Sequence, residues 1–234
     1  MYKRQKKYRA DNGYNTFKSS NDCGGSCNNR KEVLYAGSNG GMLHALDTSN
    51  GHELWAYIPP NVLKNLESIV SSKANSTNAI YGVDGSPTVK DIYFDDTPND
   101  GVNNKRWRTV LLSGLGAGGK GFFALDVTDP NNPKHLFAIE NDATNQAVKH
   151  WDKDGFKSEF GYRSGSINPD MDYRKLGETW STPRIIRIKV AGQDKWVAVF
   201  GGGYNGAVNP DIGSTVFVMD IENEGKLLKR IDIK

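Results

Sequence analysis

Hydrophobic and polar positions along the chain form three similar units. Each unit has a strand-like apolar run that ends in glycine, a glycine-rich turn, a second run that ends in aspartate, and then a third run. The glycine-ending runs are 33–37, 110–114 and 197–201, and the aspartates that end the second runs are Asp47, Asp126 and Asp220. An antiparallel unit repeated at intervals of tens of residues is typical of blades, so the pattern predicts a β-propeller.

The first unit predicts three strands followed by a short helix. The predicted strands are 32–37, 41–47 and 52–58. Asn39-Gly40 separates the first two strands and favours a tight hairpin, because both residue types tolerate positive φ. After Pro59-Pro60, the apolar positions of residues 61–80 are spaced as on one helix face. These positions are Val62, Leu63, Leu66, Ile69 and Val70.

The other two units each predict four strands. The interval from Pro87 to Asp126 is 39 positions and that from Pro183 to Asp220 is 37, close to the roughly 40–45 residues of a four-stranded blade. The sequence therefore predicts an all-β, partial propeller of about two and a half blades. Their expected bounds are roughly 32–60, 85–140 and 180–233, within one propeller domain at 32–234.

Two stretches fall outside this pattern. Residues 1–31 hold few apolar residues and no clear period, so we expect an extended or loop-like lead-in. Residues 141–178 are polar and aperiodic, so we expect a long insertion between blades, of the kind that often binds partners. Because propellers close with roughly four to eight blades, we expect further blades, from the same or another chain, to complete this one.

Charge and composition exclude several classes of protein. The formal net charge of +3 is too small to favour nucleic acid binding. No apolar run is long enough to span a membrane, and residues 1–5 begin no signal peptide. The chain is thus expected to be cytosolic or an internal piece of a longer secreted protein. Glycine makes up 26 of the 234 residues, more than its average share of roughly 7 %. The glycines gather where tight turns are predicted.

The two cysteines leave two alternatives open. Cys23 and Cys27 flank a glycine-containing turn, and two ligands are too few for a structural zinc site. A short disulfide in an oxidising compartment and a pair of free thiols fit the sequence equally well.

Catalytic motifs are weak in this sequence. Residues 114–120 look like a phosphate-binding loop, but Gly121 follows Lys120 where Ser or Thr is required, and an apolar strand follows where a helix is required. The motifs G-x-S-x-G and H-E-x-x-H do not occur, and the four histidines show no ligand spacing. We therefore predict that the protein is not an enzyme.

One acidic loop is a candidate calcium site. Its possible ligands are Asp95, Asp96, Asn99 and Asp100. A hard cation needs several oxygen ligands from one short loop, but Pro98 stands where a side-chain ligand is expected and no distal glutamate closes the loop. A solvated turn is the favoured interpretation here, and more strongly so for the acidic turn at 152–155.

The run Ala45–Trp55 resembles the tryptophan-docking motif of quinoprotein-like propellers, with Asn50 in place of a threonine. In that motif the aspartate, here Asp47, caps a turn, Gly51 supplies a permissive backbone, and Trp55 packs between neighbouring blades. The resemblance implies a structural role, shared by Asp126 and Asp220 in the later units.

Longer stretches resemble the PilY/PilC family of type IV pilus tip-associated proteins. They are residues 35–47, 83–89, 107–119 and 196–205, in the family's order. The resemblance implies a secreted protein with a C-terminal propeller that supports pilus assembly, adhesion and twitching motility. It also implies a place at the cell surface or in the periplasm, contacts with minor pilins or a surface receptor, and a calcium loop outside residues 1–234.

Two alternatives remain beside this adhesin and assembly factor. The docking motif also fits a quinoprotein-like (PQQ-type) oxidoreductase, which would carry a quinone chromophore. A periplasmic assembly scaffold is the other alternative, although it predicts evenly spaced repeats without an insertion such as 141–178.

Overall fold

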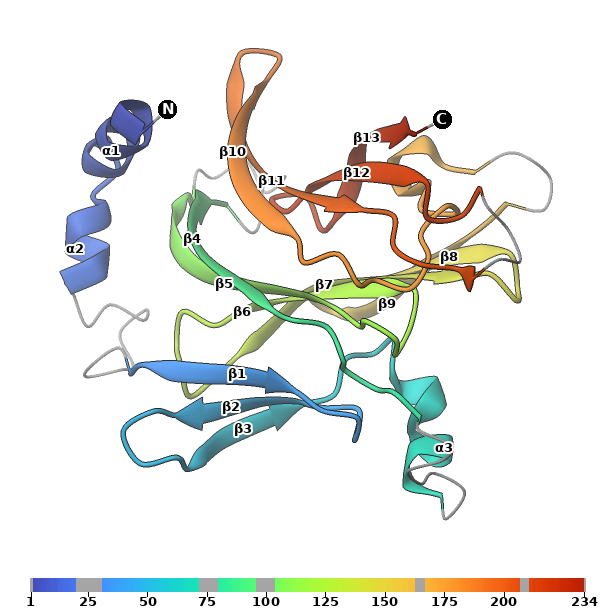
Figure 1. Ribbon diagram of the computed structural model, residues 1–234. Helices are drawn as coiled ribbons and strands as arrows, with labels where there is room; N and C mark the ends of the chain where they lie inside the picture. The colour runs from blue at the N-terminus through green and yellow to red at the C-terminus, as the bar shows by residue number, and fades with distance from the viewer. Residues whose placement is uncertain are drawn as a thin grey trace.

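The computed structural model describes residues 2–19, 31–71, 80–95, 104–162, 167–206 and 211–233. Three antiparallel sheets follow one another in chain order (Figure 1). The first sheet consists of β1 (Val33–Gly37), β2 (Leu43–Asp47) and β3 (Glu53–Tyr57). The second consists of β4 (Thr88–Phe94), β5 (Arg106–Gly114), β6 (Gly121–Asp126), β7 (Lys134–Asp142), β8 (Ala147–Asp152) and β9 (Gly155–Gly161). The third consists of β10 (Arg184–Val190), β11 (Gln193–Gly201), β12 (Thr215–Asp220) and β13 (Lys226–Asp232).

The predicted all-β partial propeller is confirmed, because each sheet is a meander in which consecutive strands pair. Among the described residues, the first sheet lacks a counterpart of β4 and β10, as the sequence predicts. The short helix is also present, as the 3-10 turn Leu63–Asn65 and α3 (Leu66–Val70). The face that packs on the core is narrower than predicted, because only Leu66 and Ile69 of these turns are partly buried against it, whereas Leu63 and Val70 are 54 % and 78 % exposed.

The expected insertion at 141–178 is wrong for its first half. β8 and β9 extend the second sheet to six strands, and the turn at 152–155 is a hairpin between them. Strand β9 forms the edge of the sheet and is mostly exposed or half-buried, so its sequence shows little apolar alternation. The 3-10 turn Pro169–Met171 follows before the third sheet begins.

The expected loop-like lead-in is also wrong. Two helices, α1 (Tyr2–Asp11) and α2 (Tyr14–Ser19), lie beside the second and third sheets (Figure 1). Helix α1 is polar and contacts the sheets through Tyr8, whose ring lies 6.2 Å from that of Trp107 in β5 and 6.3 Å from that of Trp196 in β11. Single aromatic contacts of this kind leave no apolar period in the sequence.

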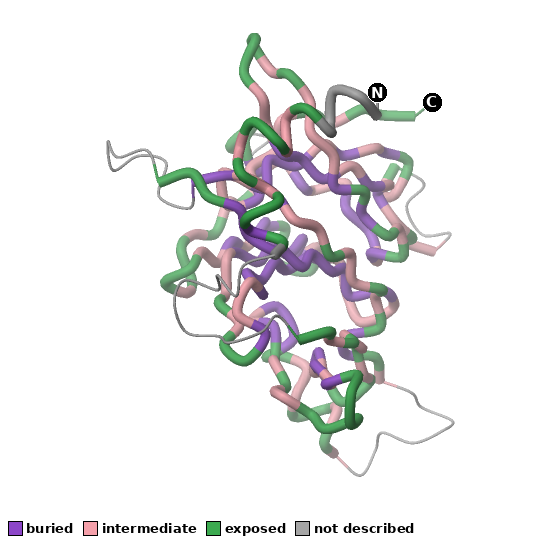
Figure 2. Tube along the Cα trace, turned by 90° about the vertical axis from the view of Figure 1, so that its left-hand side faces the viewer, coloured by how far each residue is buried: buried purple, intermediate pink, exposed green. Residues whose placement is uncertain are grey.

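The core forms two layers, one on each face of the second sheet. Strand β6 is buried throughout, and its residues alternate between the two layers as strand geometry requires. Phe122 belongs to the layer shared with the third sheet, where its ring lies 4.2 Å from that of Phe200. Phe123 belongs to the layer shared with the first sheet, beside Leu43. Figure 2 shows the buried segments concentrated in the middle of the molecule.

Candidate functional site

The three repeated aspartates occupy equivalent positions. Asp47, Asp126 and Asp220 are the last residues of β2, β6 and β12. In each case Oδ1 accepts a hydrogen bond from the backbone N–H two residues later, at 2.9 Å from Ser49, 2.9 Å from Thr128 and 3.1 Å from Glu222. This bond turns the chain at the end of the strand. The bonds from Ser49 also help to hold the pKa of Asp47 at about 2.

A basic residue faces each aspartate, which the sequence analysis did not foresee. The Oδ2 atoms lie 3.0 Å from Lys31 Nζ, 2.9 Å from Arg108 Nη1 and 2.6 Å from Lys195 Nζ. The aspartates pair in register with Val33, Val110 and Val197, so each basic residue lies two positions before the aspartate's strand partner. That recurrent spacing is the signal that could have revealed the pairs. The Arg108–Asp126 pair is the most buried, with side chains 4 % and 7 % exposed.

Trp55 connects the first sheet to the second. Its Nε1–H donates to the Pro130 carbonyl oxygen at 2.9 Å, in the turn between β6 and β7. Gly51 has φ of +74°, and its N–H donates to the Asp47 carbonyl at 2.7 Å. Positive φ is costly for residues with a Cβ, which explains glycine at this turn. The docking role of these residues stays a prediction that their geometry supports.

The glycine-rich turns hold neighbouring sheets together and do not form a phosphate cradle. Strand β6 begins at Gly121, directly after Lys120. A Cβ on Gly118 would overlap the Gly82 carbonyl oxygen, and a Cβ on Gly114 would lie 2.7 Å from the Thr179 carbonyl oxygen. Real Cβ atoms do not approach backbone so closely, so the close contact between these segments of the chain requires glycine. Lys120 Nζ donates to Asn205 Oδ1, in the loop between β11 and β12, at 2.6 Å.

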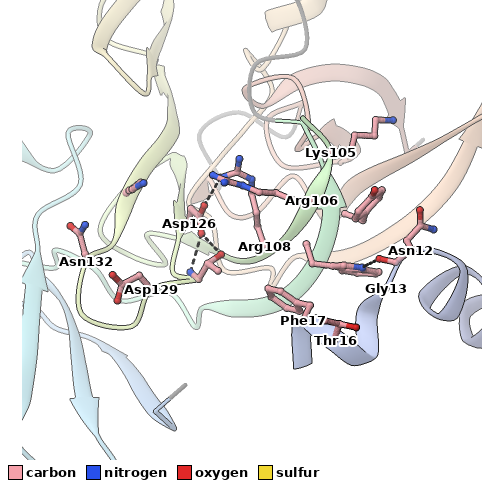
Figure 3. Close-up of a pocket in the computed structure, with 14 residues that line it drawn as sticks. Asn12, Gly13, Thr16, Phe17, Lys105, Arg106, Arg108, Asp126, Asp129 and Asn132 are labelled. Atoms are coloured by element: carbon pink, nitrogen blue, oxygen red, sulfur yellow. Dashed lines mark hydrogen bonds and ion pairs between the residues drawn. The ribbon is translucent and has the colours of Figure 1, made fainter. Parts of the chain in front are cut away.

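A cavity of about 600 Å³ lies between the N-terminal helices and the second sheet. Figure 3 shows the residues that line it. The Arg108–Asp126 pair lies in its wall, and Trp107 Nε1–H donates to the Asn12 carbonyl oxygen at 2.7 Å on the helix side. Lys105, Arg106 and Lys134 add positive charge. Its described lining includes no histidine, cysteine or serine.

A smaller cavity of about 400 Å³ shares Arg108, Asp126 and Lys134 with the first and adds His135. Tyr57 Oη lies 2.7 Å from His135 Nδ1. Burial lowers the pKa of His135 to about 4, so its imidazole is neutral at physiological pH. A half-buried neutral histidine bonded to a tyrosine of the first sheet contributes to packing between the sheets.

The candidate calcium loop is described at one of its four residues. Asp95 is buried, and its Oδ2 accepts a hydrogen bond from the Asn104 backbone N–H at 2.9 Å. Asp96, Asn99 and Asp100 lie outside the described residues, as do Cys23 and Cys27. The described part of the chain holds no group of three or more His, Cys, Asp or Glu side chains arranged for a metal. The calcium and disulfide predictions therefore stay untested.

The three meandering sheets with repeated aspartate turns define a partial β-propeller. A family model for the PilY1 β-propeller domain matches residues 7–234. The chain therefore belongs to the PilY1 β-propeller domain family, in agreement with the resemblance seen in the sequence.

Curated relatives carry the same domain. The chain is 32 % identical over 221 residues to the type IV pilus biogenesis factor PilY1 of Pseudomonas aeruginosa strain UCBPP-PA14, covering 94 % of this chain and 15 % of the relative. It is 30 % identical over 203 residues to a PilY1 homolog of Xylella fastidiosa strain Temecula1, covering 87 % and 11 %. The chain thus spans about one seventh or less of the length of these relatives.

Solved structures agree with this assignment. The crystal structure of the P. aeruginosa PilY1 C-terminal domain matches with a TM-score of 0.53 and 27 % identity, over 94 % of this chain and 32 % of that one. A quinohemoprotein alcohol dehydrogenase from Comamonas testosteroni matches with a TM-score of 0.25 and 13 % identity, over 86 % and 41 %. The second likeness is too distant to carry an argument. Among the described residues, no helix is long and apolar enough to cross a membrane.

Proposed function

We propose that this chain is the propeller portion of a type IV pilus biogenesis factor. The observation that carries the proposal is the family match over residues 7–234, joined by relatives named as such factors at 30–32 % identity. The protein acts at the pilus tip or during assembly in the periplasm, in contact with minor pilins or other tip subunits. Adhesion to a surface receptor and support of twitching motility belong to the same proposal.

The mechanism is binding by a rigid scaffold. The second sheet is buried on both faces by its neighbours, which fixes the sheets relative to one another. Loops held by such a scaffold can present a fixed surface to partner subunits without reorganising, which reduces the entropic cost of binding. No acid–base pair or nucleophile is required for this role, so we propose a non-enzymatic protein. The docking motif that also fits an oxidoreductase makes structural contacts here, through Trp55 and Asp47.

A complementation experiment tests the proposal. The gene is deleted in its own bacterium, and surface pili are quantified by shearing and immunoblotting of the major pilin. We expect pili and twitching to be lost, and to be restored by the wild-type gene and by Gly161→Ala, whose added Cβ meets nothing within 4 Å. Gly118→Ala, whose Cβ overlaps Gly82, should restore neither. Normal piliation of the deletion strain would contradict the proposal.

Calcium binding is a separate part of the proposal and has a separate test. Titration calorimetry of the purified chain with CaCl₂ is compared with that of an Asp96→Ala/Asp100→Ala variant. Heat that disappears in the variant supports a site in residues 95–100. The absence of heat from the wild-type chain assigns any calcium dependence of the pili to a different part of the protein.

A further inference from the structure

Part of the wall of the cavity of about 600 Å³ is already satisfied by contacts within the fold. Arg108 and Asp126 neutralise one another there, with Nη1 2.9 Å from Oδ2. Phe17 and Trp107, which are 8 % and 6 % exposed, add two buried aromatic rings to the same wall. A wall of buried rings and a paired charge has a low dielectric constant, so it strengthens the field of other charges that line the cavity.

The rest of the lining carries an excess of positive charge. Lys105, Arg106 and Lys134 supply three cations. Asp129 is the only carboxylate besides Asp126 among the described lining residues. Arg106 and Lys134 are exposed and form no ion pair with a described residue, and they come from the starts of two different strands, β5 and β7. Two such cations at one cavity favour a ligand with anionic groups.

Neutral hydrogen-bonding groups line the same cavity. The side-chain amide of Asn132 bonds to no described residue, and that of Asn12 donates to the Tyr8 carbonyl at 2.8 Å but leaves its Oδ1 without a partner in the described part of the chain. Asp129 Oδ1 accepts from the Asn131 N–H at 3.0 Å, which leaves Oδ2 as a further acceptor. Asn132 and Asp129 lie at one side of the cavity and Asn12 at the other (Figure 3).

These groups together define the chemistry of the ligand. An inorganic polyphosphate would pair with the cations, but it would be repelled by the Asp129 carboxylate and would offer no proton to the Asn12 oxygen. A ligand with both anionic groups and hydroxyl groups satisfies both sets, because a hydroxyl donates to carboxylate and amide oxygens and accepts from an amide N–H. Sugars that bear carboxylate or sulfate groups combine these two features.

We propose that this cavity binds an acidic carbohydrate. Its carboxylate or sulfate groups contact Arg106 and Lys134, and the planar Arg106 guanidinium can hold two oxygens of one anionic group. Its hydroxyl groups bond to Asn132, Asp129 and Asn12. The proposal goes beyond the proposed function, because pilus assembly requires no sugar ligand, and its test uses the purified chain without pili.

Titration calorimetry of the full chain, in buffer with about 0.15 M NaCl to screen distant charges, tests the site. The probes are octagalacturonate, which carries only carboxylates, and sulfated maltooctaose, which carries only sulfates, so their comparison identifies the anionic group. We expect saturable one-to-one binding of at least one probe. Arg106→Gln/Lys134→Gln should weaken it by about tenfold or more, because two charge-assisted hydrogen bonds are lost.

A matched double variant controls for net charge. Arg184→Gln/Lys229→Gln also removes two positive charges, from exposed positions in β10 and β13 that do not line the cavity. We expect it to bind within about twofold of wild type, because charges beyond the screening length contribute little. Thermal unfolding without ligand verifies the fold of both double variants, and we expect Tm values within about 2 °C of wild type.

A neutral variant separates carbohydrate recognition from ion exchange. Asn132→Ala removes an amide but no charge, so we expect binding to weaken by about threefold or more. The dependence of the affinity on NaCl concentration should stay that of wild type, because the charged contacts are unchanged.

The other outcomes each overturn the proposal. Neither probe binding at up to about 2 mM, or equal weakening in the two double variants, would mean that the cavity holds no anion site. Asn132→Ala with the affinity of wild type would reduce the interaction to ion exchange. An octaglutamate peptide that binds as tightly as the better saccharide would make an acidic polypeptide the ligand.

Discussion

Arg108 and Asp126 form a buried ion pair across β5 and β6, with Nη1 2.9 Å from Oδ2. The corresponding pairs in the other sheets, Lys31–Asp47 and Lys195–Asp220, have more exposed cations, at 42 % and 28 %. Both side chains of the pair in the second sheet are buried, and the Arg108 guanidinium carbon lies 5.5 Å from the centre of the Phe94 ring. The equivalent ion pairs therefore contribute differently to stability in the three sheets. Desolvation increases both the interaction between the two charges and the free-energy cost of losing one partner.

Removing the Arg108 charge should therefore destabilise the chain strongly. Arg108→Met leaves the Asp126 carboxylate buried beside an apolar side chain, and we expect the free energy of unfolding to fall by about 3–5 kcal/mol. Lys31→Met is the matched control, with an expected loss of at most about 1 kcal/mol because Lys31 is exposed. Urea unfolding followed by tryptophan fluorescence measures both. Equal losses in the two variants would refute the dependence on burial.

The close contact between Gly118 and Gly82 predicts a second large effect. Gly118→Ala places a Cβ within overlap distance of the Gly82 carbonyl, so either the turn or the backbone at Gly82 must move. We expect a loss of about 2–4 kcal/mol, seen as a lower Tm. Gly161→Ala should lie within about 0.5 kcal/mol of wild type. A Gly118→Ala variant as stable as wild type would show that the contact between Gly118 and Gly82 is loosely packed.

The repeated strands, the aspartate turns and the partial propeller could be predicted from the sequence because each is a local pattern. Asp126 was recognised by its position after an apolar run, but its partner Arg108 depends on strand register. Likewise, Gly118 was assigned to a turn, whereas its close contact with Gly82 arises only when two sheets pack. Strand β9 was missed because an exposed edge strand has little apolar alternation, and α1 because its main anchor is one tyrosine among basic residues.

Trp55 offers a test of how the first sheet is attached. Trp55→Phe retains an aromatic ring but loses the hydrogen bond to the Pro130 carbonyl, and we expect a loss of about 1 kcal/mol. The effect should be local. Relative to wild type, hydrogen–deuterium exchange should accelerate more in β1–β3 than in β10–β13. Mass spectrometry measures both regions on the same sample. Uniform acceleration across all sheets would indicate that the first sheet does not open independently.

His135 predicts a pH dependence of stability. Burial lowers its pKa to about 4, below the ordinary value of 6.5. Between these values the unfolded chain binds a proton that the folded chain does not, so stability rises with pH and is lost as pH falls from about 6.5 to 4. His150, whose pKa is also lowered by burial, acts in the same direction.

We expect His135→Gln to reduce this slope, with a difference of roughly 2 kcal/mol between pH 7 and pH 4 relative to wild type. Urea unfolding at several pH values provides the measurement. His52→Gln is the control variant, because it replaces an exposed histidine. An identical slope in His135→Gln and wild type would assign the pH dependence to the carboxylates instead.

Tyr8 should control the attachment of the N-terminal helices. Its ring lies 3.7 Å from the Arg187 guanidinium carbon and contacts Trp107 and Trp196, so one side chain joins α1 to the second and third sheets. Tyr8→Ala removes these aromatic and cation–π contacts, and we expect a global loss of about 1–3 kcal/mol. The larger change should be local, because a polar ten-residue helix is not stable alone in water. In hydrogen–deuterium exchange, the amides of α1 and α2 should therefore exchange at rates close to those of an unfolded peptide.

Two variants serve as controls for Tyr8→Ala. Tyr8→Phe keeps the ring and should retain most of the protection from exchange. Lys7→Ala, one residue away and exposed, should retain all of it. Protected helix amides in Tyr8→Ala would mean that Tyr14 and Phe17 of α2 suffice to hold the segment.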